Sequence, residues 1–476
     1  MKKIFSTAIL FFALFIISAS AAEGDYIIKF RKDAPVFFTY SDEAISLGGG
    51  MQLVPEETAL ALKDAGLLEI CDPDRIMTYY ESTPDDTDYS QQWNLPLIKA
   101  EYAWSLKTYG NDVLVGIIDS GLDPDHPDID YSRVVQGYNF AVDPDDGEYN
   151  TKIYDTSDTV GHGTKVSGTI VAKRNNSLGL AGIADKVKLI PLKCADNTGA
   201  IYDSTIINAI YAGAGYFGCD VLNISLGMGV TTDSLNAAIK YAIDRGCIVV
   251  AAAGNDTAQD PGDHIRYPAG CDGVISVGST THQNTRAESS VTNESVFICA
   301  PAASIPLLTH DGGYTTAGGT SFAAPQVAAA AAIAKSIDPY LTPTEFALIL
   351  QNTATLLDDN PERDIEFGYG LLNIEKMVKY MLTDRSVYVS PFDEDTCSVT
   401  LFNLTSSDVT ASSIFVSNSD GKMVYFDPQT VLIKANNSIV RTLSFEKSGR
   451  VKHLLWKTLL SAMPYDSGQY MREMTK

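Results

Sequence analysis

The middle of the chain alternates short apolar runs with longer amphipathic stretches. Five runs rich in β-branched residues predict buried strands, at 113–118, 187–192, 221–224, 248–252 and 274–277. Amphipathic segments, such as 204–216 and 232–245, lie between these runs and predict helices. Because parallel strands are joined by crossover helices that cover both faces of a sheet, the pattern predicts an α/β fold with a doubly wound, mostly parallel sheet.

The regions on either side of this sheet have other patterns. Residues 26–30 predict a strand and residues 56–65, after Pro55, predict a helix, so a small α+β unit comes first. The acidic stretch 82–88 predicts a linker. After residue 386, apolar and polar positions alternate and Ser419-Asp420-Gly421 predicts a hairpin turn, as in a small antiparallel β domain. We therefore divide the chain into segments 1–21, 22–85, 86–380 and 381–476.

The first segment has the pattern of a secretory signal peptide. Lys2 and Lys3 precede an uncharged apolar run at 9–17, and Ala19-Ser20-Ala21 supplies the small residues of a cleavage site. The apolar run is too short to span a bilayer comfortably, and no later run is long enough. The sequence thus predicts a secreted, extracellular protein, released or associated with the cell envelope, without a transmembrane anchor.

Composition narrows the class of protein. With 45% hydrophobic and 20% charged residues, the chain is an ordinary globular protein. Its net charge of -24 argues against binding to nucleic acid, whose phosphates attract basic surfaces. The 7 cysteines form no C-x-x-C pair, which argues against a redox or metal motif, and we favour buried apolar packing for them over disulfides.

Three short motifs carry residues that together could perform chemistry. Asp119-Ser120-Gly121 ends a predicted strand, Gly161-His162-Gly163-Thr164 enters a helical stretch, and Gly319-Thr320-Ser321 precedes an Ala-rich helix at 327–334. Each motif alone has a simpler explanation, respectively a turn carboxylate, a loop histidine and a helix cap. Their combination is more specific, because a serine nucleophile needs an adjacent base and a histidine base is oriented by a carboxylate.

The chain order Asp, His, Ser and the residues around each one resemble the three active-site signatures of the subtilisin-like serine peptidases, across about residues 86–380. The resemblance implies a secreted serine endopeptidase that forms an acyl-enzyme on Ser321. His162 would act as general acid and base, and Asp119 would orient it. Asn255, which follows the apolar run 249–253, would hold the oxyanion together with the Ser321 backbone N–H.

The resemblance also assigns a place for the substrate. Ser225-Leu226-Gly227 resembles the strand edge on which an extended peptide pairs through its main chain, which implies protein or peptide substrates. The pocket for the residue preceding the scissile bond, here called P1, would lie between residues 225–227 and the wall 252–254, which includes Gly254. Arg266 would lie near its floor, where the family often has a small residue.

Three outcomes are open for Arg266. Its guanidinium could meet a substrate carboxylate and favour Glu or Asp at P1, or pair with a protein carboxylate and leave a shortened pocket. Alternatively, the side chain reaches solvent and has no role.

The family resemblance implies two further features. Segment 22–85 resembles an inhibitory propeptide, which would make the chain a zymogen with its own intramolecular inhibitor. A structural Ca²⁺ site is implied at the side chains of Asp86, Asp128 and Asn176 and the backbone carbonyls near Leu178 and Leu180, whose hard oxygen ligands suit this ion. The alternative for the loop around Asn176 is a simple turn.

Two rival functions are compatible with the same fold. The first is a catalytically silent envelope or binding protein, against which the presence of Asp119, His162, Ser321 and Asn255 argues. The second is an esterase or amidase that acts on small substrates with the same residues. The last segment has no motif that distinguishes packing on the catalytic domain from binding to an envelope component or to substrate.

Overall fold

The computed structural model describes residues 25–31, 45–48, 51–73, 83–141, 152–258, 260–357, 363–382, 387–389, 398–403, 409–419, 422–433, 438–442, 450–456 and 472–474. The predicted signal peptide 1–21 and Cys397 lie outside these residues. The chain divides into two compact units, residues 1–79 and 80–476. Within the described part, no helix is long and apolar enough to cross a membrane.

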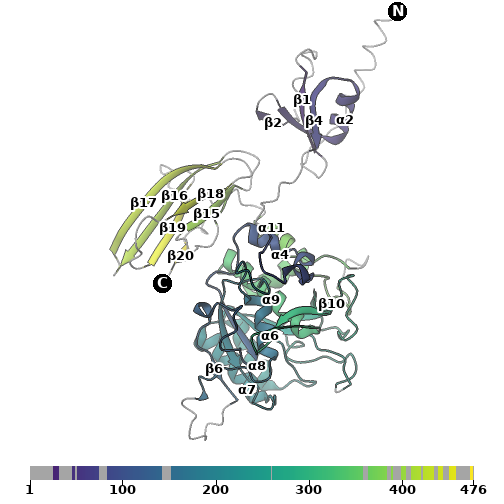
Figure 1. Cartoon of the computed structure of the whole chain (residues 1–476), viewed down its shortest axis with the longest axis vertical. Helices are drawn as coiled ribbons and strands as arrows, with labels where there is room; N and C mark the ends of the chain where they lie inside the picture. The colour runs from purple at the N-terminus through teal and green to yellow at the C-terminus, as the bar shows by residue number, and fades with distance from the viewer. Residues whose placement is uncertain are drawn as a thin grey trace, which may run out of the picture. The chain divides into compact units, whose positions relative to one another are not determined.

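The described residues of the first unit form a four-stranded antiparallel sheet and one helix (Figure 1). Its strands, in the order β2-β3-β1-β4, are β1 (Asp25–Phe30), β2 (Ile45–Gly48), β3 (Met51–Pro55) and β4 (Leu68–Pro73). Helix α2 (Glu56–Asp64) begins directly after Pro55. Ile28, Val54 and Ala59 form its buried core. The small α+β unit predicted from the sequence is confirmed.

The second unit contains a seven-stranded sheet in which every neighbouring pair is parallel. Its order is β11-β10-β9-β8-β5-β7-β6, with bounds β5 (Leu114–Asp119), β6 (Tyr138–Asn139), β7 (Lys188–Lys193), β8 (Val221–Ile224), β9 (Ile248–Ala252), β10 (Ile275–Thr280) and β11 (Ile298–Pro301). The five predicted strands are all present, because each is a β-branched run that is buried on both faces.

Helices cover both faces of this sheet (Figure 1). On one face, α7 (Asp203–Tyr211), the π-helix η4 (Ala212–Phe217) and α8 (Asp233–Asp244) share a core with alternate residues of β5, β7, β8 and β9. On the other, α9 (Thr320–Ile337) packs on β8–β11, and α6 (His162–Val171) packs on β5 and α9. The alanines of α9 are buried along its length, since small side chains let a helix approach a sheet closely.

Shorter elements complete the unit. They are η2 (Tyr89–Gln91), α3 (Asn94–Leu97), α4 (Ala100–Ser105), η3 (Tyr131–Arg133), the hairpin β12 (Ile305–Leu308) and β13 (Tyr314–Ala317), α10 (Pro343–Thr353) and α11 (Ile374–Leu382). A capping box between Thr342 and Glu345, with Pro343 between them, begins α10. The cysteines of the described residues are free thiols, and Cys194, Cys219, Cys247, Cys271 and Cys299 are buried, in agreement with apolar packing.

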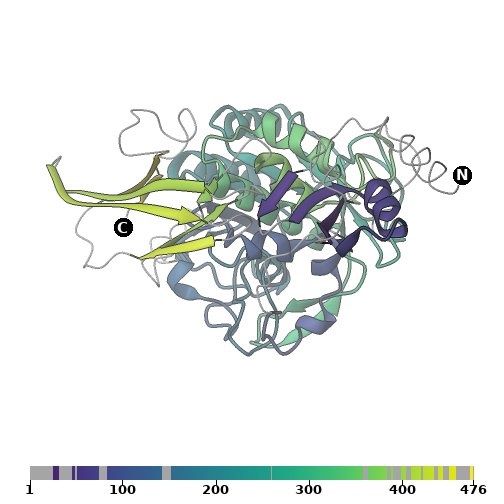
Figure 2. The ribbon, with the colours of Figure 1, turned by 90° about the horizontal axis from the view of Figure 1, so that it is seen from above.

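The last part of the chain is antiparallel, as predicted. One sheet has the order β14-β15-β18 and the other β17-β16-β19-β20. The strands are β14 (Val387–Val389), β15 (Ser398–Asn403), β16 (Val409–Ser419), β17 (Lys422–Ile433), β18 (Ser438–Thr442), β19 (Arg450–Trp456) and β20 (Arg472–Met474). Figure 2 shows β16 and β17 as long yellow-green ribbons, which pair antiparallel. Asp420 and Gly421 of the predicted hairpin turn lie outside the described residues.

Candidate active site

The strand order places the predicted site residues at the carboxyl ends of neighbouring central strands of the parallel sheet. From β5 the chain passes to β6 and β7 on one side and then crosses to β8 on the other, and such a reversal creates a crevice at the carboxyl ends of the strands. Asp119 is the last residue of β5, Ser225 directly follows β8, and Asn255 follows β9. His162 begins α6 and Ser321 lies in the first turn of α9.

Asp119 and His162 form a close pair. Nδ1 of His162 lies 2.8 Å from Oδ1 and 3.0 Å from Oδ2 of Asp119, whose Oδ1 also accepts a hydrogen bond from the Ser120 backbone N–H. The buried carboxylate raises the pKa of His162 above its ordinary value, against the effect of burial. Because Nδ1 faces the carboxylate, Nε2 is the ring nitrogen that remains to take a proton from a neighbouring group.

Ser321 is held by contacts with Ser225. The Ser321 hydroxyl donates to the Ser225 carbonyl over 3.1 Å, and the Ser225 hydroxyl donates to the Ser321 carbonyl over 2.8 Å. Among the described residues, no hydrogen bond joins Ser321 to His162. The His162 ring nevertheless lies 5.6 Å from the ring of Phe322, the next residue after Ser321. A rotation of the Ser321 side chain is therefore needed to bring its hydroxyl to His162.

The amide of Asn255 has a defined orientation. Its Oδ1 accepts a hydrogen bond from the Thr320 backbone N–H over 3.0 Å and lies 3.3 Å from the Thr320 hydroxyl. That hydroxyl in turn accepts from the Gly254 N–H over 3.2 Å. With Oδ1 fixed by donors, the Nδ2 group is the end that can donate to a ligand beside Ser321.

The sequence analysis did not identify Asp158, which links the segment after Asp119 to the first turn of the helix that begins at His162. Oδ1 of Asp158 accepts from the Ser120 hydroxyl and from the N–H groups of Val160 and Gly161, and Oδ2 accepts from the N–H and hydroxyl of Thr164. Burial tends to raise the pKa of Asp158, but these hydrogen bonds outweigh it and the pKa is lowered. An aspartate four residues before a helix-starting histidine was the available signal, as a potential capping side chain.

Two of the predicted calcium ligands, Asp86 and Asp128, are neighbouring carboxylates. Asn176 lies beside them, but its Nδ2 donates to Asp128 and its Oδ1 accepts the Leu178 N–H. Asp86 and Asp128 are both buried. Asp86 Oδ2 accepts the Asn175 N–H, whereas its buried Oδ1 has no hydrogen-bond partner. Burial raises the pKa of Asp128 to about 6, and the nearby Asp86 adds to that effect, while hydrogen bonds from Leu180 N–H and Asn176 oppose it. An unpartnered oxygen and two neighbouring buried acids fit a divalent cation with a preference for oxygen ligands.

Arg266 is buried and does not reach solvent, so the alternative of a solvent-exposed, inactive side chain is wrong. Its Nε pairs with a carboxylate oxygen of Asp260, and its terminal nitrogens donate to backbone carbonyls of the loop 255–264. A protein carboxylate therefore meets the guanidinium.

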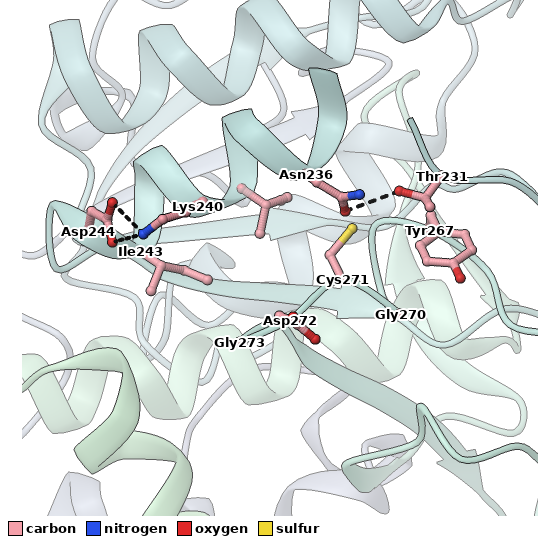
Figure 3. Close-up of a pocket in the computed structure, with 11 residues that line it drawn as sticks. Thr231, Asn236, Lys240, Ile243, Asp244, Tyr267, Gly270, Cys271, Asp272 and Gly273 are labelled. Atoms are coloured by element: carbon pink, nitrogen blue, oxygen red, sulfur yellow. Dashed lines mark hydrogen bonds and ion pairs between the residues drawn. The ribbon is translucent and has the colours of Figure 1, made fainter. Parts of the chain in front are cut away.

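A separate pocket of about 630 Å³ lies along α8 (Figure 3). Lys240 and Asp244 form an ion pair at one end, and Thr231 hydrogen-bonds Asn236 at the other (Figure 3). Its lining includes Tyr267 but none of Asp119, His162 and Ser321. The pocket is thus distinct from the candidate active site.

Comparisons with known proteins show the family of the chain. Residues 110–370 match the subtilase family. The chain is 37% identical to subtilisin DY of Bacillus licheniformis over 284 residues, which cover 60% of this chain and 97% of that protein. It is 32% identical to subtilisin E of Bacillus subtilis (strain 168) over 362 residues, 75% of this chain and 91% of that protein. Among solved structures, a protease from Pseudoalteromonas arctica PAMC 21717 matches with a TM-score of 0.56 and 27% identity, covering 63% of this chain and all of that one.

Proposed function

The chain belongs to the subtilase family and is a serine endopeptidase, and from this premise we propose that Ser321, His162 and Asp119 are its catalytic residues. The observation that carries the assignment is the hydrogen bond between His162 Nδ1 and the buried Asp119 carboxylate, at the carboxyl end of β5. This arrangement leaves Nε2 of His162 as the base for the serine.

Catalysis then follows from the roles of these groups. The Ser321 hydroxyl rotates from the Ser225 carbonyl toward His162, transfers its proton to Nε2 and attacks the scissile carbonyl. His162 returns the proton to the leaving amine, which gives an acyl-enzyme that water hydrolyses with the same histidine as base. Asp119 keeps the imidazole in the required tautomer and stabilises the imidazolium.

The oxyanion is held by two donors. Asn255 contributes Nδ2, whose direction is fixed because Thr320 occupies Oδ1, and Ser321 contributes its backbone N–H. The positive end of helix α9 adds to this stabilisation. A peptide substrate pairs along Ser225–Gly227, past the end of β8, where Gly227 is exposed.

The remaining segments complete a secreted zymogen. Residues 1–21 direct export, and residues 22–85 form an inhibitory propeptide that precedes the catalytic domain 86–380. Residues 381–476 form a small antiparallel β domain. The compact α+β unit within 25–73 supports a propeptide that folds as a unit.

Asp86, Asp128 and Asn176, with carbonyls near Leu178 and Leu180, would hold a calcium ion. The unpartnered Asp86 Oδ1 supports this, because a buried carboxylate oxygen without a donor is costly unless a cation meets it. When bound, the ion supplies positive charge that neutralises the two acids and holds the N-terminal stretch near residue 86 to the loop 175–180. It takes no part in the reaction.

Ser321→Ala tests the assignment. If one nucleophile serves both reactions, the variant loses peptidase activity and labelling by a fluorophosphonate probe, and it accumulates as an unprocessed chain. Ser132→Ala is the matched control, since Ser132 is exposed in η3 and its hydroxyl donates to the Asp130 carboxylate two residues before it. Normal processing of purified Ser321→Ala without added protease would refute self-maturation, and retained labelling would refute the nucleophile.

A further inference from the structure

The side chain of Arg266 is buried within the segments that flank the candidate P1 pocket. It is 3% exposed, although an arginine is almost never fully buried unless it is paired. The guanidinium meets the Asp260 carboxylate through Nε and donates to four backbone carbonyls, those of Asn255, Asp260, Gly262 and His264. Each nitrogen has an acceptor from the protein, so the charge is already compensated and little is left for a substrate carboxylate.

The stem of Arg266 fills space beside the oxyanion residue. A Cβ added to Gly254 would lie 2.4 Å from Cγ of Arg266, and the neighbouring Asn255 carbonyl accepts a hydrogen bond from the guanidinium. A Cβ added to Gly227 would lie 3.8 Å from Cβ of Arg266. The side chain therefore starts between the strand edge 225–227 and the wall 252–254, where the substrate's P1 side chain would enter.

Several side-chain hydrogen bonds and an ion pair hold the loop before Arg266 in place. The Asp256 carboxylate accepts the Gly262 N–H over 2.8 Å, and Asp260 also pairs with His264 at 3.0 Å. The Asp263 carboxylate accepts the Thr292 N–H over 2.8 Å. Because the loop is fixed at both ends and at its centre, the guanidinium cannot move aside without breaking several hydrogen bonds at once.

We propose that Arg266, held by Asp260, is a plug that closes the deep end of the P1 pocket and restricts cleavage to peptide bonds after residues with short side chains. The proposal rests on the proposed function and deepens it by naming a substrate class. It decides between the alternatives left by the sequence, because an arginine that is fully paired by the protein acts through its volume rather than through its charge.

The test compares kcat/KM on peptides that differ only at P1, carrying Ala, Leu, Phe or Glu. Wild type cleaves the Ala peptide best. Arg266→Gly removes the plug and raises the ratio of Phe to Ala at least about tenfold, which corresponds to about 1.4 kcal/mol. Arg266→Met keeps most of the volume without the charge and retains the preference for Ala. Arg245→Gly, at the exposed end of α8, is the matched control and leaves the profile unchanged.

The outcomes separate the plug from its alternatives. A profile in Arg266→Gly that equals wild type, or a uniform loss on all peptides, would make Arg266 a structural residue and overturn the proposal. A Glu preference in wild type that Arg266→Met abolishes would establish attraction by charge instead. If wild type labels with fluorophosphonate and cleaves peptides but prefers Phe, only the plug fails. If wild type neither labels nor cleaves, the proposed function fails with it.

Discussion

Replacing Asp158 tests whether one buried carboxylate organises the segments on both sides of His162. In Asp158→Asn, one carboxylate oxygen becomes an NH₂ group, so it must face donors whichever way the amide turns. On the Oδ1 side it would face the N–H groups of Val160 and Gly161, and on the Oδ2 side the N–H of Thr164. The second orientation is less costly, because the Thr164 hydroxyl can reverse and accept whereas a backbone N–H cannot.

The expected loss of stability in Asp158→Asn follows from that orientation of the amide. One buried backbone donor stays unpaired, which costs about 1–3 kcal/mol in the free energy of unfolding. Asp155→Asn is the matched control in the same loop, since Asp155 is exposed and accepts a 3.0 Å bond from Ser157 N–H. It should cost less than about 0.5 kcal/mol, as is usual for surface substitutions.

The measurement is urea unfolding in the Ser321→Ala background, where autolysis cannot remove unfolded chains. Because the folded pKa of Asp158 is lowered, its contribution is present above the unfolded pKa of about 3.9 and is lost as the pH falls through the folded pKa. The difference between the Asp158→Asn variant and its parent should therefore be constant from about pH 7 to pH 5 and shrink below about pH 4. Equal stability of the Asp158 and Asp155 variants at pH 7 would refute the reasoning.

Two more outcomes are expected. In Asp119→Asn, the pKa of His162 falls because the carboxylate that raises it is gone. The acidic limb of the pH profile of kcat/KM should then shift to lower pH, while kcat falls by about 10⁴-fold. An acidic limb at the same pH as in wild type would show that a group other than His162 titrates there. Chelation of calcium should lower the melting temperature more than the initial rate, because Asp86 and Asp128 lie outside the catalytic triad. The same melting temperature in excess calcium and in excess chelator would count against the calcium site. So would a melting temperature of Asp128→Ala that depends on calcium as strongly as that of wild type.

Five of the strands were predictable because each is a short apolar run that is buried on both faces, whereas β6 and β11 were not predicted. The helix predicted at 204–216 was only partly right, since α7 ends at Tyr211 and continues as a π-helix to Phe217. A Cβ on Gly213 would lie 2.7 Å from a Leu222 methyl, and one on Gly215 would lie 2.5 Å from the Tyr241 hydroxyl. These glycines permit contacts with distant elements, and helical periodicity contains no information about such contacts.

In the candidate site, too, local motifs were predictable from the sequence and contacts between distant segments were not. The motifs around Asp119, His162 and Ser321 are local, so their residue types and chain order were enough to predict these three residues as a catalytic triad. Asp158 was missed because its partners lie up to 38 residues away in sequence, at Ser120. Its role exists only once β5 and α6 are adjacent, and the local signal, an aspartate four residues before His162, predicts a helix cap and not the bond to Ser120.

Arg266 marks the limit of reasoning from charge alone. A buried guanidinium needs a partner, but the sequence offers several acids near it, at Asp256, Asp260 and Asp263. The fold selects Asp260 because the other two carboxylates accept backbone N–H groups that fasten the loop. The same fold requires glycine at 254, where φ is 113° and a Cβ would collide with the Arg266 stem. Gly254 and Arg266 therefore form one structural unit, and opening the pocket requires a change at Arg266, since any side chain at Gly254 would narrow it further.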